Sequence, residues 1–197
     1  MKLCNCLCNF VTHELHQTIK QFQHYVILVN ENDKPVGTME KLEAHQKGIL
    51  HRAFSIFIFN SKGEMLLQKR ALKKYHSPGL WSNACCSHPR PNEETKIAAV
   101  RRLQEEMGFT SPLEKAFDFV YTISFENGLT ENEFDHVFIG EFDGEVKADP
   151  EEVADYTFRS MEEIRQDLLE KRGNYTAWFQ IAFPKIEGWL EENRQKQ

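Results

Sequence analysis

Two kinds of pattern predict an α+β domain in which a mixed β-sheet is sandwiched between helices. Strand-like apolar runs fill residues 25–70 and return after residue 116, and amphipathic helix patterns lie between these groups and near the end of the chain. This order of strands, helix, strands and helices is typical of an α+β fold. At 197 residues the chain is long enough to bury one core without disulfides. We therefore expect one domain over residues 25–193, after an extension over residues 1–24 that is either helical or disordered.

The first half of the domain is predicted to contain two strand pairs. Residues 25–30 (YVILVN) are typical of a buried strand, residues 32–35 of a turn, and residues 36–40 of the start of a second strand. Residues 53–60 (AFSIFIFN) and 64–70 (EMLLQKR) flank the turn sequence SKG, which predicts a hairpin.

A long loop and a helix are predicted to follow. The loop covers residues 71–91 and contains the run CCSHP, and loops of this length in compact domains are usually functional. Asn92 is expected to cap a helix over residues 93–107 that ends at Gly108. The apolar face of this helix is predicted to consist of Ile97, Val100, Leu103 and Met107.

The second half is predicted to contain a strand pair and two helices. Strands over residues 117–125 and 133–142 are joined through an Asn-Gly turn. The sequence SMEE at residues 160–163 is a capping box, which predicts a helix that ends at Gly173. A last amphipathic helix is expected over residues 178–193, bent by Pro184.

The composition indicates a globular protein and excludes several classes. Lys and Arg number 24 against 30 Asp and Glu, for a net charge of −6, whereas a general nucleic-acid binder needs a basic stripe. Fifteen Phe, three Trp and five Tyr are too many aromatic residues for a disordered chain. No apolar run approaches the roughly 20 residues of a membrane span.

The cysteines and the first residues favour the cytoplasm. Five cysteines are an odd number, which suits reduced thiols better than a set of disulfides. The start of the chain, MKLCNCLCNF, is too short and too polar for a secretory signal. Cys4, Cys6 and Cys8 could bind a soft metal or carry a lipid, but a frayed terminus is the simpler interpretation. Nothing in the sequence requires more than a monomer.

Three histidines and a group of carboxylates are candidate metal ligands. His45 and His51 are six residues apart, so a helix alone does not stack them, and His88 follows the cysteine pair. If residues 131–135 form a strand, then Glu131, Glu133 and Asp135 share one face. Such a face is either a solvated edge or part of a site for a divalent metal such as Zn²⁺, Mn²⁺ or Mg²⁺.

The predicted helix resembles the core of a Nudix box. The segment RRLQEEMG at residues 101–108 matches the end of the pattern G-x5-E-x7-R-E-U-x-E-E-x-G-U, in which U is apolar, and Glu93 fills its first Glu. However, Ser87 stands where the pattern has Gly, and Arg102 stands where a hydrolase needs a metal-binding Glu. The resemblance implies a Nudix-like scaffold with a rebuilt hydrolytic site.

Several motifs in order make the resemblance more specific, and the chain is similar to type 1 isopentenyl-diphosphate Δ-isomerases over about residues 25–190. The matching segments are GTMEK (37–41) with Ala44-His45, HRAFS (51–55), RAL (70–72), PGLWSNACCSHP (78–89), RRL (101–103), ENE (131–133) and AWF (177–179). The resemblance implies a metal-dependent enzyme that isomerises isopentenyl diphosphate to dimethylallyl diphosphate in isoprenoid biosynthesis.

The resemblance also implies roles for individual residues. Cys86 and Glu133 would be the acid/base groups on opposite faces of the alkene, with Tyr121 beside Glu133 and Trp178 against the hydrocarbon. One divalent metal (Zn²⁺, Mn²⁺ or Mg²⁺) would be held by His45, His51, His88, Glu131 and Glu133. Glu106 would help to hold a second Mg²⁺ bound with the diphosphate. The phosphate oxygens would be contacted by Lys41, Arg70, Lys74 and Arg102.

The chemistry calls for these residue types. Protonation of an unactivated alkene needs an acid held close in a water-poor pocket, and a second group must then remove a different proton. An indole face can stabilise the intervening carbocation by about 2 kcal/mol when it is desolvated. The sequence has no GxGxxG after a strand and no P-loop, so no nucleotide or flavin cofactor is expected.

Each candidate also has a simpler interpretation. Trp178 and Tyr121 lie in apolar patterns and could be core residues. Arg102 and Glu106 are four apart on one helix and could form an ordinary surface ion pair. The alternative functions are a Nudix diphosphate hydrolase, which Arg102 and Ser87 disfavour, and a metal-stabilised binding module without turnover.

Overall fold

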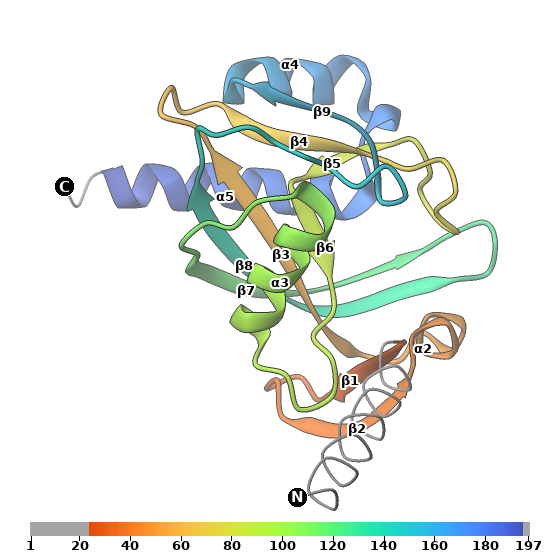
Figure 1. Cartoon of the computed structure of the whole chain (residues 1–197). Coiled ribbons are helices and arrows are strands. Elements are labelled where there is room, and N and C mark those ends of the chain that lie inside the picture. The colour runs from red at the N-terminus through yellow and green to blue at the C-terminus, as the bar shows by residue number, and fades with distance from the viewer. Residues whose placement is uncertain (1–23, 195–197) are drawn as a thin grey trace, which may run out of the picture.

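Six of the nine strands of the described residues lie between Tyr25 and Ser87, and all nine assemble into one mixed sheet with helices against both of its faces (Figure 1). The computed structural model describes residues 24–194. The strands are β1 (Tyr25–Val29), β2 (Pro35–Glu40), β3 (His51–Phe59), β4 (Met65–Arg70), β5 (Trp81–Asn83), β6 (Cys85–Ser87), β7 (Glu114–Ser124), β8 (Thr130–Glu141) and β9 (Val153–Arg159). The helices are α2 (Lys41–Lys47), α3 (Thr95–Met107), α4 (Met161–Glu170), a 3₁₀ turn (Arg172–Asn174) and α5 (Ala177–Arg194). This α+β arrangement is the predicted one.

Strand β3 is the centre of the sheet and separates two apolar cores. Alternate side chains of a strand point to opposite faces, and Phe54, Ile56 and Ile58 of β3 pack in the core that contains the buried residues of α3. Phe57 and Phe59 pack in the other core. That second core contains Ile164 of α4 and the buried face of α5, formed by Trp178, Phe179, Ala182, Phe183 and Ile186.

On the α5 side of the sheet, the apolar stripe becomes polar toward one end. Along β3 the side chains of this face run from Phe59 and Phe57 to Ser55 and then His51, all of them buried. Strand β8 pairs with β3 in parallel over His51–Phe59, and its matching face runs from Val137 to Asp135 and Glu133. Polar side chains of two neighbouring strands are thus buried together at one end of the sheet.

The sheet opens beside this polar end because β3 and β4 diverge. They pair only at Phe59 and Met65. Beyond this point β6 pairs with β3, whereas β5 and β9 pair with β4. The gap gives side chains from both helix layers access to one cavity.

The structure corrects several predicted elements. The expected loop over residues 71–91 contains the short strands β5 and β6. The helix begins at Thr95 with Glu94 at its N-cap, and Asn92 lies in a turn with φ 65°, so the predicted cap is wrong. Ile97 is 60% exposed, because the buried face of α3 consists of Ala98, Ala99, Leu103, Glu106 and Met107.

Two elements were not predicted from the sequence, whereas the predicted capping box is confirmed. Helix α2 has only seven residues, and most side chains of β9 are exposed or half-buried, so neither shows a strong periodic pattern. The Ser160 side chain accepts from the backbone N–H of Glu163, whose carboxylate accepts from the backbone of Ser160. Helix α5 continues through Pro184.

Some expectations concern the ends of the chain. The predicted extension over residues 1–24, with Cys4, Cys6 and Cys8, falls outside the described residues, except for His24. Within residues 24–194, no helix is long and apolar enough to cross a membrane.

Candidate active site

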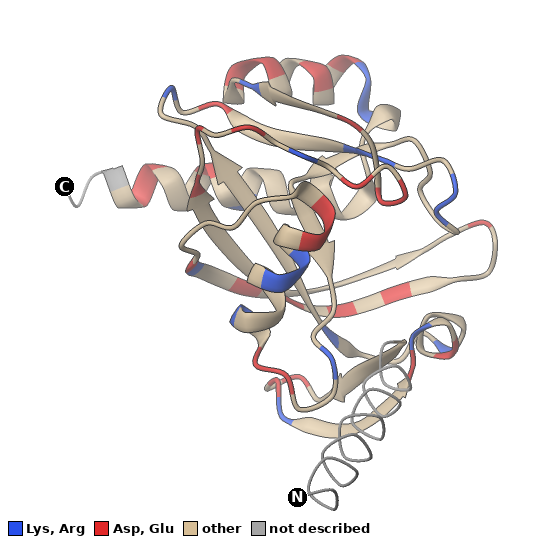
Figure 2. Ribbon diagram, viewed as in Figure 1, with Lys and Arg blue, Asp and Glu red and all other residues tan. Residues whose placement is uncertain are grey.

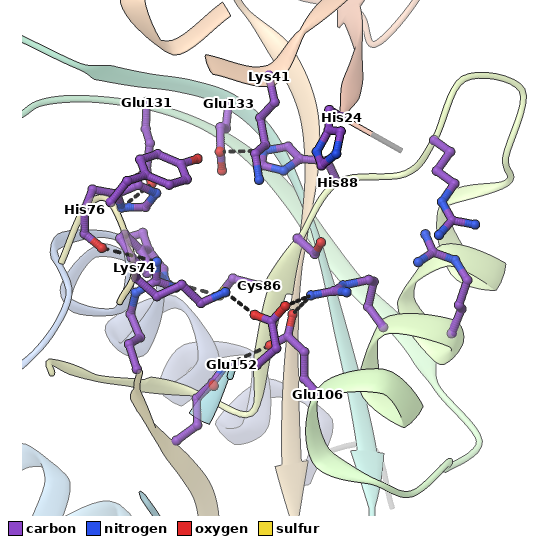
Figure 3. Close-up of a pocket in the computed structure, with 18 of the residues that line it drawn as sticks. His24, Lys41, Lys74, His76, Cys86, His88, Glu106, Glu131, Glu133 and Glu152 are labelled. Atoms are coloured by element: carbon purple, nitrogen blue, oxygen red, sulfur yellow. Dashed lines mark hydrogen bonds and ion pairs between the residues drawn. The ribbon is translucent and has the colours of Figure 1, made fainter. Parts of the chain in front are cut away.

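The cavity at the opened end of the sheet has a volume of about 360 Å³ (Figure 3). Its lining comes from α2, β4, β6, β7, β8, α3, α5 and the loops that follow β4 and β6. Eleven of the thirteen predicted site residues line it: Lys41, Arg70, Lys74, Cys86, His88, Arg102, Glu106, Tyr121, Glu131, Glu133 and Trp178. The other two, His45 and His51, are buried against Glu133.

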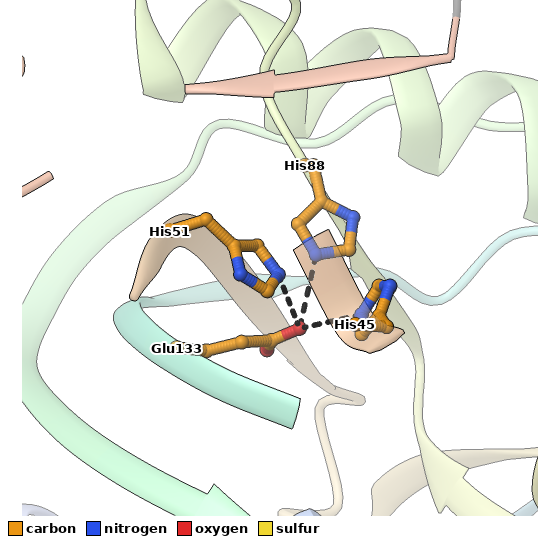
Figure 4. A group of neighbouring side chains, drawn as sticks. All are labelled: His45, His51, His88 and Glu133. Carbon is orange, nitrogen blue, oxygen red and sulfur yellow. Dashed lines mark hydrogen bonds and ion pairs between the residues drawn. The ribbon is translucent and has the colours of Figure 1, made fainter. Parts of the chain in front are cut away.

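Three histidines and one carboxylate converge beside this cavity (Figure 4). His45, His51, His88 and Glu133 offer ligand atoms that all lie within 4.8 Å of one another. The Oε1 atom of Glu133 is 2.9 Å from Nε2 of His88, 3.5 Å from Nε2 of His51 and 3.8 Å from Nε2 of His45. Residues from α2, β3, β8 and the segment after β6 meet here.

The orientation of two imidazoles suits a metal ion. The Nδ1 atoms of His45 and His51 lie 2.7 and 2.8 Å from the backbone carbonyls of Lys41 and Ile49, respectively. Since a carbonyl only accepts, Nδ1 carries the proton and the lone pair of Nε2 faces the cluster. Both Nε2 atoms are buried and have no hydrogen-bond partner among residues 24–194. A divalent metal would satisfy them, and this donor set is one that such ions accept.

The electrostatics of the cluster keep Glu133 charged and His88 neutral. Burial acts to raise the pKa of Glu133, but its contacts with the three histidines outweigh burial and hold the pKa well below its usual range. Burial lowers the pKa of His88 to about 3, although Glu133 opposes the shift. A neutral imidazole and an ionised carboxylate are the forms that ligate metals.

Glu131 lies beside this cluster but outside the group of four. Its Oε2 atom accepts from the Tyr121 hydroxyl over 3.3 Å, and its Oε1 atom is 3.5 Å from Nδ1 of His76. Burial and the charge of Glu133 raise the pKa of Glu131 well above its usual value. Its role as a fifth ligand stays a prediction.

Tyr121 connects the two glutamates. The register of β7 and β8 pairs Tyr121 with Glu133, and the Tyr121 hydroxyl donates to Oε2 of Glu133 over 2.5 Å. Burial, together with the charges of Glu131 and Glu133, raises the pKa of Tyr121 well above its usual value. The phenol therefore holds its proton next to the Glu133 carboxylate.

Cys86 has three polar neighbours. Its thiol donates to Oδ1 of Asn83 over 3.0 Å, lies 3.6 Å from the Ser55 hydroxyl, and accepts from the indole N–H of Trp178 over 3.1 Å. Burial, followed by the charge of Asp135, raises the pKa of Cys86 to about 12. The group is a neutral thiol at physiological pH.

Basic side chains concentrate at the cavity of this acidic protein. Of the residues that the structure describes, six cationic side chains and four carboxylates line it, whereas the whole chain carries a net charge of −6. Figure 2 shows basic residues on α3, beside acidic ones, and in the loop after β4, whereas most of the charged residues on α4 are acidic. Burial and the nearby charges of Lys74 and Arg102 lower the pKa of Lys41. Cations held this close to one another favour an anionic ligand.

Part of this positive charge is neutralised by ion pairs. Arg102 bonds Glu106 over 2.5 Å and Glu152 over 3.2 Å, and Lys74 also pairs with Glu152. Glu106 is buried and accepts from the Gln68 amide over 3.3 Å. The ion pair between Arg102 and Glu106 expected from helix spacing is thus present at the cavity wall.

Trp178 lies in the wall formed by α5. Its indole is buried, donates to the Ser82 hydroxyl over 2.9 Å as well as to Cys86, and has the guanidinium of Arg70 5.1 Å from its ring centre. This indole already makes a cation–π contact.

Sequence reasoning missed several residues that line the cavity or contact its side chains, among them Gln68, His76, Asn83 and Glu152. The spacing of these residues in the sequence does not indicate a site, because only the tertiary structure brings them to the cavity. The only sequence signal for His76 is its place two residues after Lys74 in the long loop.

The comparisons with known proteins agree with this geometry. A family model described as the NUDIX domain matches residues 49–179. The isopentenyl-diphosphate Delta-isomerase of Pectobacterium atrosepticum is 49% identical over 172 residues, which cover 87% of this chain and 96% of the relative. Isopentenyl-diphosphate Delta-isomerase 1 of Aromatoleum aromaticum is 50% identical over 171 residues, which cover 87% of this chain and 97% of the relative.

Solved structures show the same fold at low sequence identity. DR0079 from Deinococcus radiodurans superposes with a TM-score of 0.62 at 16% identity, covering 75% of this chain and 90% of that chain. A MutT protein from Methanosarcina mazei Go1 reaches 0.59 at 25% identity, covering 73% and 95%. The chain belongs to the NUDIX domain family and, within it, to the family of the isopentenyl-diphosphate Delta-isomerases.

Proposed function

We propose that the protein converts isopentenyl diphosphate to dimethylallyl diphosphate by moving a proton onto the alkene and removing another. The observation that carries the proposal is the position of two proton-bearing groups, the Cys86 thiol and the Tyr121–Glu133 pair, in one positively lined cavity. The identity to relatives that bear this activity in their names supports it.

The strand pairing places the two groups on opposite edges of β3. Cys86 pairs with Ser55 on one edge of β3, and Glu133 pairs with His51 on the other edge. His51 and Ser55 are four residues apart, roughly 13 Å along the strand, and both face the α5 side of the sheet. A five-carbon chain between the side chains of Cys86 and Glu133 would present one face to each of them.

The reaction needs no oxidant and leaves the diphosphate intact. One group adds a proton to the terminal CH₂ of the alkene, which creates a tertiary carbocation. The other group removes a proton from the CH₂ that lies next to the cationic carbon on its diphosphate side, which forms the new double bond. Trp178 would stabilise the positive charge by a cation–π contact of about 2 kcal/mol when desolvated. Since the thiol and the phenol both hold their protons, either side has a donor for the first step.

The basic residues would bind the other end of the substrate. Lys41, Arg70, Lys74 and Arg102 would contact phosphate oxygens, because charge-assisted hydrogen bonds to phosphate are strong and directional. Glu106 would hold the Mg²⁺ that accompanies the diphosphate, through the oxygens now paired with Arg102 and Gln68.

The metal cluster would complete the site. His45, His51, His88 and Glu133, with Glu131 as the fifth ligand, would hold one divalent ion, Zn²⁺, Mn²⁺ or Mg²⁺. When bound, such an ion fixes the orientation of its carboxylate ligands and tunes their acidity. The chain itself orients the Tyr121 hydroxyl onto Glu133.

A proton and phosphorus NMR time course with isopentenyl diphosphate and Mg²⁺, after metal analysis, tests the proposal. Dimethylallyl methyl signals with an intact diphosphate are expected. Orthophosphate or the monophosphate would instead indicate a hydrolase. No change with a full metal complement would indicate a binding module.

A further inference from the structure

His76 is a largely buried histidine in the cavity wall to which the proposed reaction assigns no role. It lies in the loop between β4 and β5, and its side chain is 9% exposed. Its Nδ1 atom is buried, has no hydrogen-bond partner within the described part of the chain and lies 3.5 Å from Oε1 of Glu131 (Figure 3). An unpaired nitrogen that faces a buried carboxylate is costly unless the two interact.

Aromatic neighbours hold the His76 ring in place. The ring stacks on Phe125 with centres 5.3 Å apart and meets Trp178 edge-on at 5.7 Å. Tyr75 covers another side at 4.6 Å. The backbone carbonyl of His76 accepts from the Arg70 guanidinium over 3.3 Å. Both the ring and the backbone are therefore tied to residues of the site.

The two oxygens of Glu131 have different partners. Oε1 faces His76, whereas Oε2 accepts from Tyr121, which also donates to Glu133. His76 itself is not part of the group of four metal-ligating residues. It therefore lies behind a candidate ligand, which is the usual place for a group that orients a metal-binding carboxylate.

We propose that His76 is a positioning residue that donates from Nδ1 to Oε1 of Glu131 and so orients this carboxylate toward the metal cluster. The inference deepens the proposed function, because it rests on Glu131 being the fifth ligand. Hydrogen-bonded partners of ligating groups typically change metal affinity or activity by 10- to 100-fold, so the expected effect is measurable.

Two substitutions separate the nitrogen from the ring. In His76→Asn, the amide nitrogen occupies the position of Nδ1 and keeps the donor, but the ring is lost. In His76→Phe, the ring and its packing against Phe125 and Trp178 remain, but the donor is lost. His136→Gln is a control for loss of a buried histidine on the same sheet, since His136 pairs with Asp33 and Asp118 away from the cavity.

The test is a Mn²⁺ titration of each full-length, chelator-treated protein, with free Mn²⁺ measured by electron paramagnetic resonance. We expect the Kd for Mn²⁺ to rise about 10- to 100-fold in His76→Phe and to stay near the wild-type value in His76→Asn and His136→Gln. Circular dichroism establishes that each variant is folded. A Kd near the wild-type value in His76→Asn would not be expected if the ring acted only by packing, because this variant lacks the ring.

Other outcomes overturn the inference. Wild-type affinity in His76→Phe would show that the nitrogen has no part in metal binding. Equal weakening in His76→Asn and His76→Phe would show that a hydrogen-bond donor at this position does not restore metal binding, which would contradict the positioning role. Absence of Mn²⁺ binding by the wild type would remove the premise of the inference. The Mn²⁺ titration contains no substrate, so its result does not depend on isomerase activity. A negative result in the isomerase assay and a negative result in the titration can therefore be told apart.

Discussion

The indole N–H of Trp178 donates a hydrogen bond to the sulfur of Cys86 over 3.1 Å, across 92 positions of the sequence. The thiol in turn donates to Asn83. An N–H that faces sulfur stabilises a thiolate after the thiol has given up its proton. Trp178 would thus act on the proposed chemistry in two ways. Its indole N–H contacts the proposed acid/base group Cys86, and the face of its ring binds a cation, as its contact with Arg70 shows.

We expect Cys86→Ala to reduce turnover by about 10³-fold, because acid/base groups contribute 10²–10⁴-fold to rate. The KM for isopentenyl diphosphate should change little, since Cys86 makes none of the expected phosphate contacts. Steady-state kinetics measure both parameters. Substantial residual turnover would contradict the assigned role.

The neighbouring thiol is a matched control for this variant. Cys85 is fully buried in the core on the α3 side of the sheet, so Cys85→Ala should lose some stability and keep most of its turnover. A similar loss of turnover in both variants would indicate damage to β6 in place of a missing acid/base group.

His88→Ala should lower the bound metal and the activity together. Its Nε2 atom lies 2.9 Å from Glu133 within the cluster of four, and removal of one imidazole ligand leaves only three of these four groups. Elemental analysis of the purified variant, with His136→Gln alongside, measures the metal. A full metal load in His88→Ala would show that this histidine is an ordinary core residue.

The adjacent lysines Lys73 and Lys74 should behave differently. Lys74 lines the cavity with a side chain that is 25% exposed, whereas Lys73 is 78% exposed and pairs with Glu151. We expect Lys74→Met to raise the KM by about 10- to 100-fold, the equivalent of 1.5–3 kcal/mol for a hydrogen bond to a charged group. Lys73→Met should leave the KM unchanged, and equal effects in the two variants would argue against a phosphate contact by Lys74.

The ion pair before α3 should make stability depend on pH. Glu93 bonds Arg101 through both carboxylate oxygens, over 2.7 and 2.8 Å. Burial acts to raise the pKa of Glu93, but Arg101 and the backbone N–H of Arg90 outweigh it and lower the pKa. A carboxyl whose pKa is lower in the folded state stabilises the fold above its unfolded pKa, and this contribution is lost as the pH falls through the folded pKa.

Glu93→Gln should therefore reduce the free energy of unfolding by about 1–2 kcal/mol at pH 7. The difference from wild type should shrink once the pH falls below about 4. Urea denaturation across this pH range measures it. Glu145→Gln is the control, because the pair between Glu145 and Lys147 is largely exposed. A difference that does not change with pH would contradict the ion-pair explanation.

Local patterns predicted elements well where a single segment contains its own signal. The capping box at Ser160 and Glu163 is confirmed, and the turn before Met65 connects an antiparallel pair with Gly63 at φ 75°. The prediction failed at Asn92 and Ile97. There the Glu93–Arg101 ion pair and the packing of α3 decided where the helix begins and which face is buried.

The sequence by itself determined the fold class, the alternation of side chains between the two faces of β3 and of β8, and the residue types of the site. These properties depend on neighbours in the chain. Only the tertiary structure decided which of those residues meet. The spacing of His45 and His51 did not predict a shared ligand site. Parallel pairing of β3 with β8 places His51 next to Glu133, 82 positions away in the sequence. The contact between His76 and Glu131 likewise depends on how a loop packs over the sheet, and no local periodicity encodes such packing.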